Sequence, residues 1–242
     1  MNNVKTVTIG NATLHLNDST KLVEEFKNMN LKVNHIITDP PYNISKSNNF
    51  TTMDGNRSGL DFGEWDKDFD VTSWIKDYVE ILDNNGSIII FCSYLYLSDI
   101  SNSLKQNGIL VKDILVWQKS NPMPRNINRR YVQDMEFAIW GVKKGAKWTF
   151  NKAEDKPYER SLFTTPLVSG KERLGHPTQK SLKLMQQIIN IHTNENDLIL
   201  DPFMGSGTTA EAAARQKRNF IGVEITPEYY NLSLKRVKEF YK

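Results

Sequence analysis

Hydrophobic residues follow two patterns along the chain. Short apolar runs rich in β-branched residues predict strands, and they occupy 33–38, 86–91, 113–117, 136–141, 197–200 and 219–223. Apolar residues that recur every three or four positions predict helices, and they occupy 71–82, 181–192, 208–216 and 227–240. Because strands alternate with helices, we predict an α/β fold with a doubly wound, mostly parallel sheet.

Two segments interrupt this alternation. Residues 43–65 are polar and rich in Gly, Asn and Ser, which predicts a long mobile loop. Residues 151–175 are charged and have no clear period, which predicts irregular structure. Since neither an internal repeat nor a low-complexity linker divides the chain, we expect one domain over residues 1–242.

Composition narrows the class of protein. The 242 residues are 39% hydrophobic, but the longest apolar runs, such as 88–92, fall short of the roughly 20 residues of a membrane helix. The N-terminus lacks the apolar stretch of a secretory signal, so we expect a cytoplasmic protein without membrane association. The single Cys92 excludes an intrachain disulfide, and the four scattered histidines form no ligand pattern, so no metal is expected.

Charge is unevenly distributed. Residues 117–180 carry 13 Lys or Arg against 6 Asp or Glu, although the net charge of the chain is only +3. This asymmetry favours a segment that faces a polyanion. A solvated basic surface without a partner is the alternative.

The first chemical motif is Asp39-Pro40-Pro41-Tyr42, directly after the strand predicted at 33–38. In an open parallel sheet, ligands bind beyond the carboxyl ends of strands. The prolines stiffen the turn, so that a carboxylate, a free carbonyl and an aromatic ring project together. Asp39 and the Pro40 carbonyl can accept the two hydrogens of a planar amine while Tyr42 stacks on its ring. A proline-capped turn without catalytic function is the alternative.

The second motif is the glycine-rich turn at 200–209, between a predicted strand and a predicted helix. Glycines let a ligand approach the backbone, and the helix N-terminus offers free N–H groups. Glu224 ends the next strand, where its carboxylate could accept both hydroxyls of a ribose. The turn also matches the dinucleotide fingerprint, so NAD binding stays open. The third motif, His-Pro-Thr-Gln-Lys at 176–180, precedes the helix at 181–192, with Thr178 as its expected N-cap.

Taken together, the three motifs resemble those of the β-class amino-methyltransferases of DNA, in which Asp-Pro-Pro-Tyr precedes Phe-x-Gly-x-Gly. The resemblance extends from about Asp18 to the C-terminus, and is greatest to small bacterial N6-adenine enzymes with Phe-Gly-Glu-Trp-Asp at 62–66 and Asn-Pro-Met-Pro-Arg-Asn at 121–126. It implies a Rossmann-like methyltransferase fold with circularly permuted motif order. It also implies S-adenosylmethionine as cofactor and S-adenosylhomocysteine as product.

The resemblance assigns roles by position. The implied catalytic residues are Asp39, Pro40, Pro41 and Tyr42. The implied cofactor-binding residues are Asp18, Asp39, His176, Thr178, Gln179, Asp201, Phe203, Gly205, Ser206, Gly207, Thr208 and Glu224. Asp18 follows Asn17 where the family has glycine, and Asn also tolerates the left-handed backbone conformation.

The motif also bears on the substrate. In the family, an initial Asp goes with adenine and an initial Ser with the N4 position of cytosine, so Asp39 favours adenine. Cytosine C5 methylation needs a Cys nucleophile, whereas Cys92 lies on a predicted buried strand. We therefore predict a site-specific DNA adenine-N6 methyltransferase that acts on a flipped-out base. The alternatives are N4-cytosine methylation, an RNA substrate, a dinucleotide-dependent oxidoreductase and a DNA-binding module without catalysis.

The basic segment at about 121–175 is the expected DNA-recognition region. Its candidate phosphate contacts are Arg125, Arg129, Arg130, Lys143, Lys144 and Lys147. Tyr131 and Trp148 are candidates for stacking on bases, whereas Trp140 is expected in the core. A homodimer and a restriction endonuclease of the same system are further expected partners.

Overall fold

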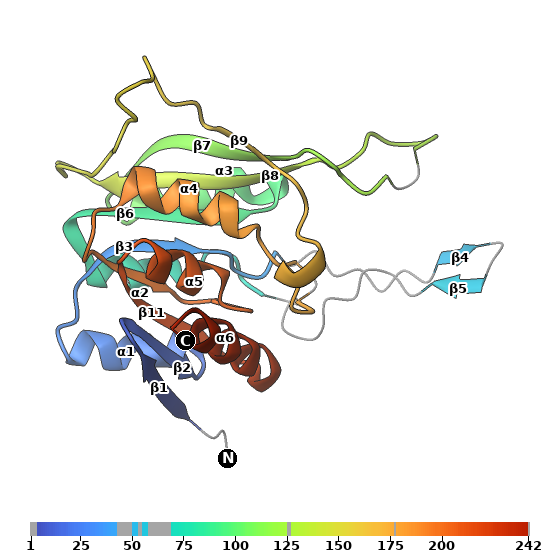
Figure 1. The fold of residues 1–242 in the computed structure, drawn as a ribbon. Helices are drawn as coiled ribbons and strands as arrows, with labels where there is room; N and C mark the ends of the chain where they lie inside the picture. The colour runs from blue at the N-terminus through green and yellow to red at the C-terminus, as the bar shows by residue number, and fades with distance from the viewer. Residues whose placement is uncertain are drawn as a thin grey trace.

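The computed structural model describes residues 4–42, 50–52, 55–57, 69–124, 127–176 and 178–241, with the backbone alone for 50–52, 55–57 and 171. The loop predicted at 43–65 therefore lies largely outside the described residues. Within it, β4 (Phe50–Thr52) pairs antiparallel with β5 (Gly55–Arg57) (Figure 1).

A nine-stranded sheet runs through the chain in the order β1-β2-β11-β10-β3-β6-β8-β7-β9. Its strands are β1 (Lys5–Ile9), β2 (Ala12–Leu16), β3 (Val33–Thr38), β6 (Leu82–Cys92), β7 (Ile109–Lys119), β8 (Met135–Lys143), β9 (Leu162–Thr165), β10 (Leu198–Asp201) and β11 (Asn219–Glu224). The five central strands from β2 to β6 are parallel, whereas β1 and β8 run antiparallel to their neighbours. The mostly parallel sheet is thus confirmed.

Helices cover both faces of the sheet. They are α1 (Ser19–Asn28), α2 (Ile75–Ile81), α3 (Leu97–Gln106), α4 (Leu182–His192), α5 (Thr208–Arg215) and α6 (Pro227–Phe240), with 3₁₀ turns η2 (Tyr94–Tyr96) and η3 (Gly170–Glu172). One core cluster joins the sheet to α4, α5 and α6, the near face in Figure 1, and a second joins it to α1, α2 and α3. This arrangement confirms the doubly wound architecture. No helix among the described residues is long and apolar enough to cross a membrane.

The central strands show why their sequences are almost uniformly apolar. Along β6, Ile88 and Ile90 belong to the second core cluster, while Ile89 and Phe91 belong to the first. Alternate side chains point to opposite faces of a sheet, so a strand covered on both faces needs apolar residues at every position.

Several elements differ from the expectations. The helix expected at 71–82 begins only at Ile75, because the Asp70 carboxylate accepts hydrogen bonds from the backbone of Thr72 and Ser73 and holds a turn there. The helices α1 and α3 and the strands β1, β2 and β9 were not predicted. β9 lies within 151–175, the segment expected to be irregular.

Candidate active site

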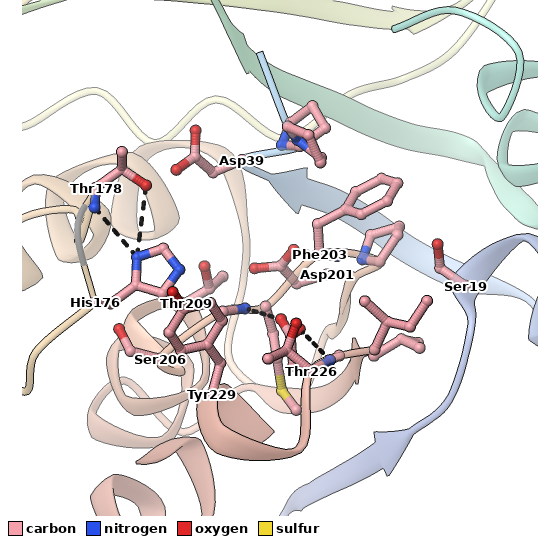
Figure 2. A pocket seen from close by; sticks show the side chains of 18 of the residues that line it. Ser19, Asp39, His176, Thr178, Asp201, Phe203, Ser206, Thr209, Thr226 and Tyr229 are labelled. Carbon is pink, nitrogen blue, oxygen red and sulfur yellow. Dashed lines mark hydrogen bonds between the residues drawn. The ribbon is translucent and has the colours of Figure 1, made fainter. Parts of the chain in front are cut away.

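A cavity of about 360 Å³ lies at the carboxyl ends of β2, β11, β10 and β3. It brings together most of the predicted site residues: Asp18, Asp39, Pro40, Pro41, Tyr42, His176, Thr178, Gln179, Asp201, Phe203, Gly205, Ser206, Thr208 and Glu224. Figure 2 shows Asp39, His176, Asp201 and Phe203 around the same space. Because the four strands are parallel neighbours, the segments that follow them meet at one edge of the sheet.

Gly207 does not line this cavity, and its glycine serves another purpose. It is the N-cap of α5 with a φ of 78°, and a Cβ there would lie 2.8 Å from the Cβ of Ser233 and 3.0 Å from its Cα. Gly207 therefore lets α5 approach α6. Gly205 does face the cavity, where a Cβ would lie 3.2 Å from His176 Nε2.

Asp39 is held from two sides. Its Oδ1 accepts a hydrogen bond from the Tyr42 hydroxyl at 2.6 Å, and its Oδ2 accepts one from Lys180 Nζ at 2.6 Å. Burial raises the pKa of Asp39, while the Lys180 charge opposes this rise. Each oxygen keeps a free lone pair, so the carboxylate can still accept a hydrogen bond from an amine.

Asp201 joins the ends of two strands. Its Oδ1 accepts hydrogen bonds from the Thr38 hydroxyl at 2.6 Å and from the Phe203 backbone at 3.1 Å. Burial raises the pKa of Asp201 to about 7, against the effect of these hydrogen bonds. The contact ties the start of the glycine-rich turn to the end of β3, directly before Asp39.

Glu224 occupies the position expected for binding two hydroxyls. Its carboxylate accepts from the backbone N–H of Gly205 at 3.0 Å and from that of Thr226 at 2.7 Å. Only 8% of the residue is exposed, and burial raises the pKa of its carboxyl. The Thr226 hydroxyl and the Ile225 backbone also hydrogen-bond to this carboxylate, so its orientation in the cavity wall is fixed.

Asp18 has a structural role as well as a place in the cavity wall. It is the N-cap of α1, where its Oδ1 accepts from the Thr20 backbone at 3.0 Å. Asn17 does not use the left-handed conformation that Asn tolerates, since its φ is not positive. Its side-chain oxygen instead accepts from the Asp18 backbone at 2.8 Å.

His176 and Thr178 line the cavity next to each other. The Thr178 backbone donates to His176 Nδ1 at 3.3 Å, and the His176 ring lies 4.4 Å from that of Tyr229 (Figure 2). Burial, assisted by the charges of Lys180 and Arg236, lowers the pKa of His176 to about 4, so the ring is neutral at pH 7.

The expectation that Thr178 is the N-cap of α4 is wrong. The helix begins at Leu182 with Ser181 as its N-cap, whose hydroxyl accepts from the Leu184 backbone at 3.5 Å. Gln179 holds the preceding segment in place. Its side-chain oxygen accepts a hydrogen bond from the Leu174 backbone N–H, and its side-chain nitrogen donates one to the Glu172 carbonyl.

The structure adds residues that the motifs did not indicate. Further lining residues are Ser19, Thr20, Phe69, Met185, Thr209, Ile225, Thr226, Tyr229 and Lys180. Phe69 packs edge-on against Phe203 at 5.5 Å, and nothing in the sequence signals this contact. Lys180, by contrast, is the last residue of the third motif, so its position in that motif was a signal in the sequence for its contact with Asp39.

The predicted DNA contacts separate into two groups, with Arg125 outside the described residues. Arg129 and Arg130 are exposed in the loop between β7 and β8, which starts at the cavity edge because Phe137 pairs with Cys92 at the end of β6. The other group lies at the opposite end of β8, where Lys143 is the last residue of the strand and Lys144 and Lys147 follow it. The two groups therefore lie at opposite edges of the sheet.

The aromatic and cysteine expectations also have outcomes. Trp140 and Cys92 are buried in the core as predicted. Burial raises the pKa of the Cys92 thiol to about 12, which excludes a ready nucleophile. Tyr131 is 96% exposed, whereas Trp148 lies under Lys112 Nζ at 4.0 Å near the far edge. Among the described residues, no group of three acidic, His or Cys side chains is placed to hold a metal.

Comparison with known proteins gives a consistent set of matches. A family model described as DNA methylase matches residues 33–235. The type II methyltransferase M2.LlaDCHI of Lactococcus lactis subsp. cremoris is 32% identical over 246 residues, which cover 95% of this chain and 90% of that protein. M2.DpnII of Streptococcus pneumoniae, also a type II methyltransferase, is 32% identical over 91% of this chain and 87% of its own.

Solved structures match as well. M1.HpyAVI in complex with S-adenosylmethionine superposes with a TM-score of 0.79 at 46% identity, covering 93% of this chain and 98% of that one. The cytosine-N4-specific PvuII DNA methyltransferase superposes with a TM-score of 0.73 at 19% identity, covering 97% and 92%. At that identity the second likeness concerns the fold alone.

Proposed function

The chain belongs to the DNA methylase family, and on this premise we propose that it methylates the N6 amino group of adenine in DNA with S-adenosylmethionine as donor. The observation that carries the proposal is the meeting of the Asp39-Pro40-Pro41-Tyr42 turn with Glu224 in one cavity. A dinucleotide-dependent oxidoreductase would use the glycine-rich turn at 200–209, but it would have no use for the Asp39-Pro40-Pro41-Tyr42 turn. A methyltransferase of this family uses both turns.

The cavity has the features that a bound S-adenosylmethionine needs. Glu224 is a buried carboxylate in the cavity wall, fixed by backbone N–H groups where it can accept ribose hydroxyls. The rings of Phe69 and Phe203 provide an apolar wall, and a cavity of about 360 Å³ lies within the usual range for ligand sites. The neutral His176 leaves the cofactor's positive sulfonium without a competing charge from its ring.

Asp39 and the Pro40 carbonyl act on the substrate amine. When bound, S-adenosylmethionine supplies an electrophilic methyl group to that nitrogen. Asp39 accepts one amine hydrogen and the Pro40 carbonyl accepts the other, which favours a localised lone pair on nitrogen. As nitrogen gains positive charge, the ionised Asp39 stabilises it. The nitrogen then loses one proton, and Asp39, whose pKa burial raises, is placed to receive it.

Adenine is preferred to cytosine because Asp39 begins the motif. N4-cytosine methylation would use the same two acceptors, so it is the second candidate and a distinct outcome of the test below. An adenine inside a duplex cannot enter such a cavity and must be flipped out, at a cost of a few kcal/mol. We propose that the loop bearing Arg129 and Arg130 contacts the duplex beside the cavity.

Two assemblies belong to the proposal. The type II class of the relatives supports a restriction endonuclease partner of the same system. A homodimer is the second, and light scattering on the purified chain with and without DNA tests it. A mass of twice 27.9 kDa supports a dimer, and a monomer in both states refutes it.

The test is transfer of labelled methyl groups from S-adenosylmethionine to unmethylated DNA, followed by mass spectrometry of the nucleosides. Wild type is compared with Asp39→Ala and with Asp155→Ala, which removes an exposed carboxylate away from the cavity. We expect N6-methyladenine with wild type and Asp155→Ala but not with Asp39→Ala. N4-methylcytosine would overturn the choice of base, and labelled RNA with unlabelled DNA would overturn the substrate.

A further inference from the structure

A chain of alternating charges leads to Asp39 from the antiparallel part of the sheet. Lys119 Nζ, at the end of β7, lies 2.7 Å from Glu136 Oε1 near the start of β8. Glu136 Oε2 lies 3.0 Å from Lys180 Nζ, and Lys180 Nζ lies 2.6 Å from Asp39 Oδ2. The motifs assign no role to Glu136 or to Lys180.

Lys180 is the buried centre of this chain. Its side chain is 5% exposed, and its ammonium lies 5.2 Å from the ring centre of Tyr42 and 5.3 Å from that of Phe91. A buried ammonium is stable only when it is paired with opposite charge. Two carboxylates, Asp39 and Glu136, supply that charge.

The contacts leave Asp39 one preferred orientation. Prolines fix the backbone after it, the Tyr42 hydroxyl holds Oδ1, and Lys180 holds Oδ2. Each oxygen then has one free lone pair, in a direction set by these two donors. Without Lys180 the carboxylate would lose one of its two anchors and the only cation in contact with it among the described residues.

We propose that Lys180, held in place by Glu136, is a positioning residue for methyl transfer, which keeps Asp39 ionised and directs its free lone pairs toward the target amine. The proposal deepens the proposed function and rests on it for the identity of that amine. Lys180 acts through Asp39, and Glu136 acts in two ways: it holds Lys180 in place, and its own charge opposes that of Lys180 at Asp39.

The two charges act on Asp39 in opposite directions. Lys180 lowers the pKa of Asp39, whereas Glu136 raises it. The other titratable groups that face Asp39, Lys180 or Glu136 are Tyr42, Cys92, Lys119, His176 and Asp201. All of them remain in the variants below, so any difference in the Asp39 titration comes from the substituted residue.

The experiment measures the Asp39 titration directly by carboxyl-carbon NMR on the full chain, with the signal assigned from its loss in Asp39→Asn. Removal of an opposite charge at this distance raises a carboxyl pKa by about 1–3 units, so Lys180→Met should shift the titration upward by that amount. Glu136→Gln should shift it downward, and Lys180→Arg should keep it near wild type. Lys27→Met is the matched control, since Lys27 contacts Asp77 and Glu80 away from the cavity.

The same variants are then compared in the pH dependence of single-turnover methyl transfer. The acidic limb should move upward in Lys180→Met and downward in Glu136→Gln, because only ionised Asp39 has the negative charge that stabilises the positive charge on the amine nitrogen. The proposal is overturned if the pKa of Asp39 is unchanged in both variants or moves in the same direction in both. If the pKa moves as expected but the acidic limb of the transfer rate does not, the role in methyl transfer is overturned. If Lys180→Met does not fold, the downward shift in Glu136→Gln decides. Failure of wild type to methylate DNA overturns the proposed function, while the NMR titration still tests the charge pair.

Discussion

Replacing Gly207 or Gly205 with alanine distinguishes two roles that glycine has in the same turn, which are helix packing and room in the cavity wall. Both residues have positive φ, 78° and 52°. At Gly207 the new methyl group would meet the Cα and Cβ of Ser233 on α6, whereas at Gly205 it would meet the ring of His176 in the cavity wall. The first substitution should therefore affect helix packing, and the second should affect the cavity.

The magnitudes follow from these contacts. A non-glycine residue in the left-handed region costs about 1–2 kcal/mol. An extra methyl group against the buried α6 backbone adds about 1–3 kcal/mol, so Gly207→Ala should lose about 2–5 kcal/mol of unfolding free energy. Gly145→Ala is the matched control, since Gly145 has a φ of 84° and a Cβ there would meet nothing within 4 Å, which leaves the backbone contribution alone.

The assay combines urea unfolding with calorimetric titration of S-adenosylhomocysteine. Gly207→Ala should bind the ligand as wild type does while it is folded, but unfold at lower urea than Gly145→Ala. Gly205→Ala should bind about tenfold more weakly, equivalent to about 1.4 kcal/mol, because the methyl displaces His176. Weaker binding with unchanged stability in Gly207→Ala would place that glycine in the ligand site and refute the packing explanation.

Three further predictions concern separate parts of the molecule. Glu224→Gln should weaken binding of S-adenosylhomocysteine by calorimetry, because an amide offers one acceptor oxygen instead of two, and unchanged affinity would exclude the ribose role. Arg129→Ala and Arg130→Ala should each lower the slope of log K against log salt for duplex DNA by about 0.9, while Lys144→Ala should not. Burial lowers the pKa of His192 to about 3 from 6.5, so the unfolded chain binds more protons as pH falls through this window. The contribution of His192 to stability should thus fall by about 1.4 kcal/mol per pH unit from pH 6.5 down to about 3, and His192→Phe should remove this contribution to the slope in urea unfolding.

The sequence predicts the centre of the fold well because central strands and their helices are strongly patterned. β3 and α6 occur where expected, since a strand buried on both faces and a helix with Pro227 in its first turn leave clear signals. β9 leaves none. It is short, with alternate exposed and buried residues, and depends on pairing with β7 and on the Trp117 Nε1 to Thr165 hydroxyl bond at 2.7 Å.

The site was predictable as far as it follows strand ends. Asp39, Asp201 and Glu224 each stand at or directly after the end of a parallel strand, so the topology alone brings them together. The pairing of Lys180 with Glu136 does not follow from such a rule. These residues are 44 positions apart in the chain. They meet only because β8 runs antiparallel to β6, which places the start of β8, and with it Glu136, at the edge of the sheet where the cavity lies.

The position of β8 also shows why a stretch of sequence rich in Lys and Arg need not form one continuous basic surface. The excess of Lys and Arg between 117 and 180 is one run in the chain, but β8 divides it. Nine residues of strand at about 3.3 Å each separate the two groups of basic side chains by about 30 Å. If the proposed contact of DNA with the loop that bears Arg129 and Arg130 holds, a duplex at the cavity would have to pass around the sheet to reach Lys144. We therefore expect the DNA footprint to be confined to the edge of the sheet at which the cavity lies.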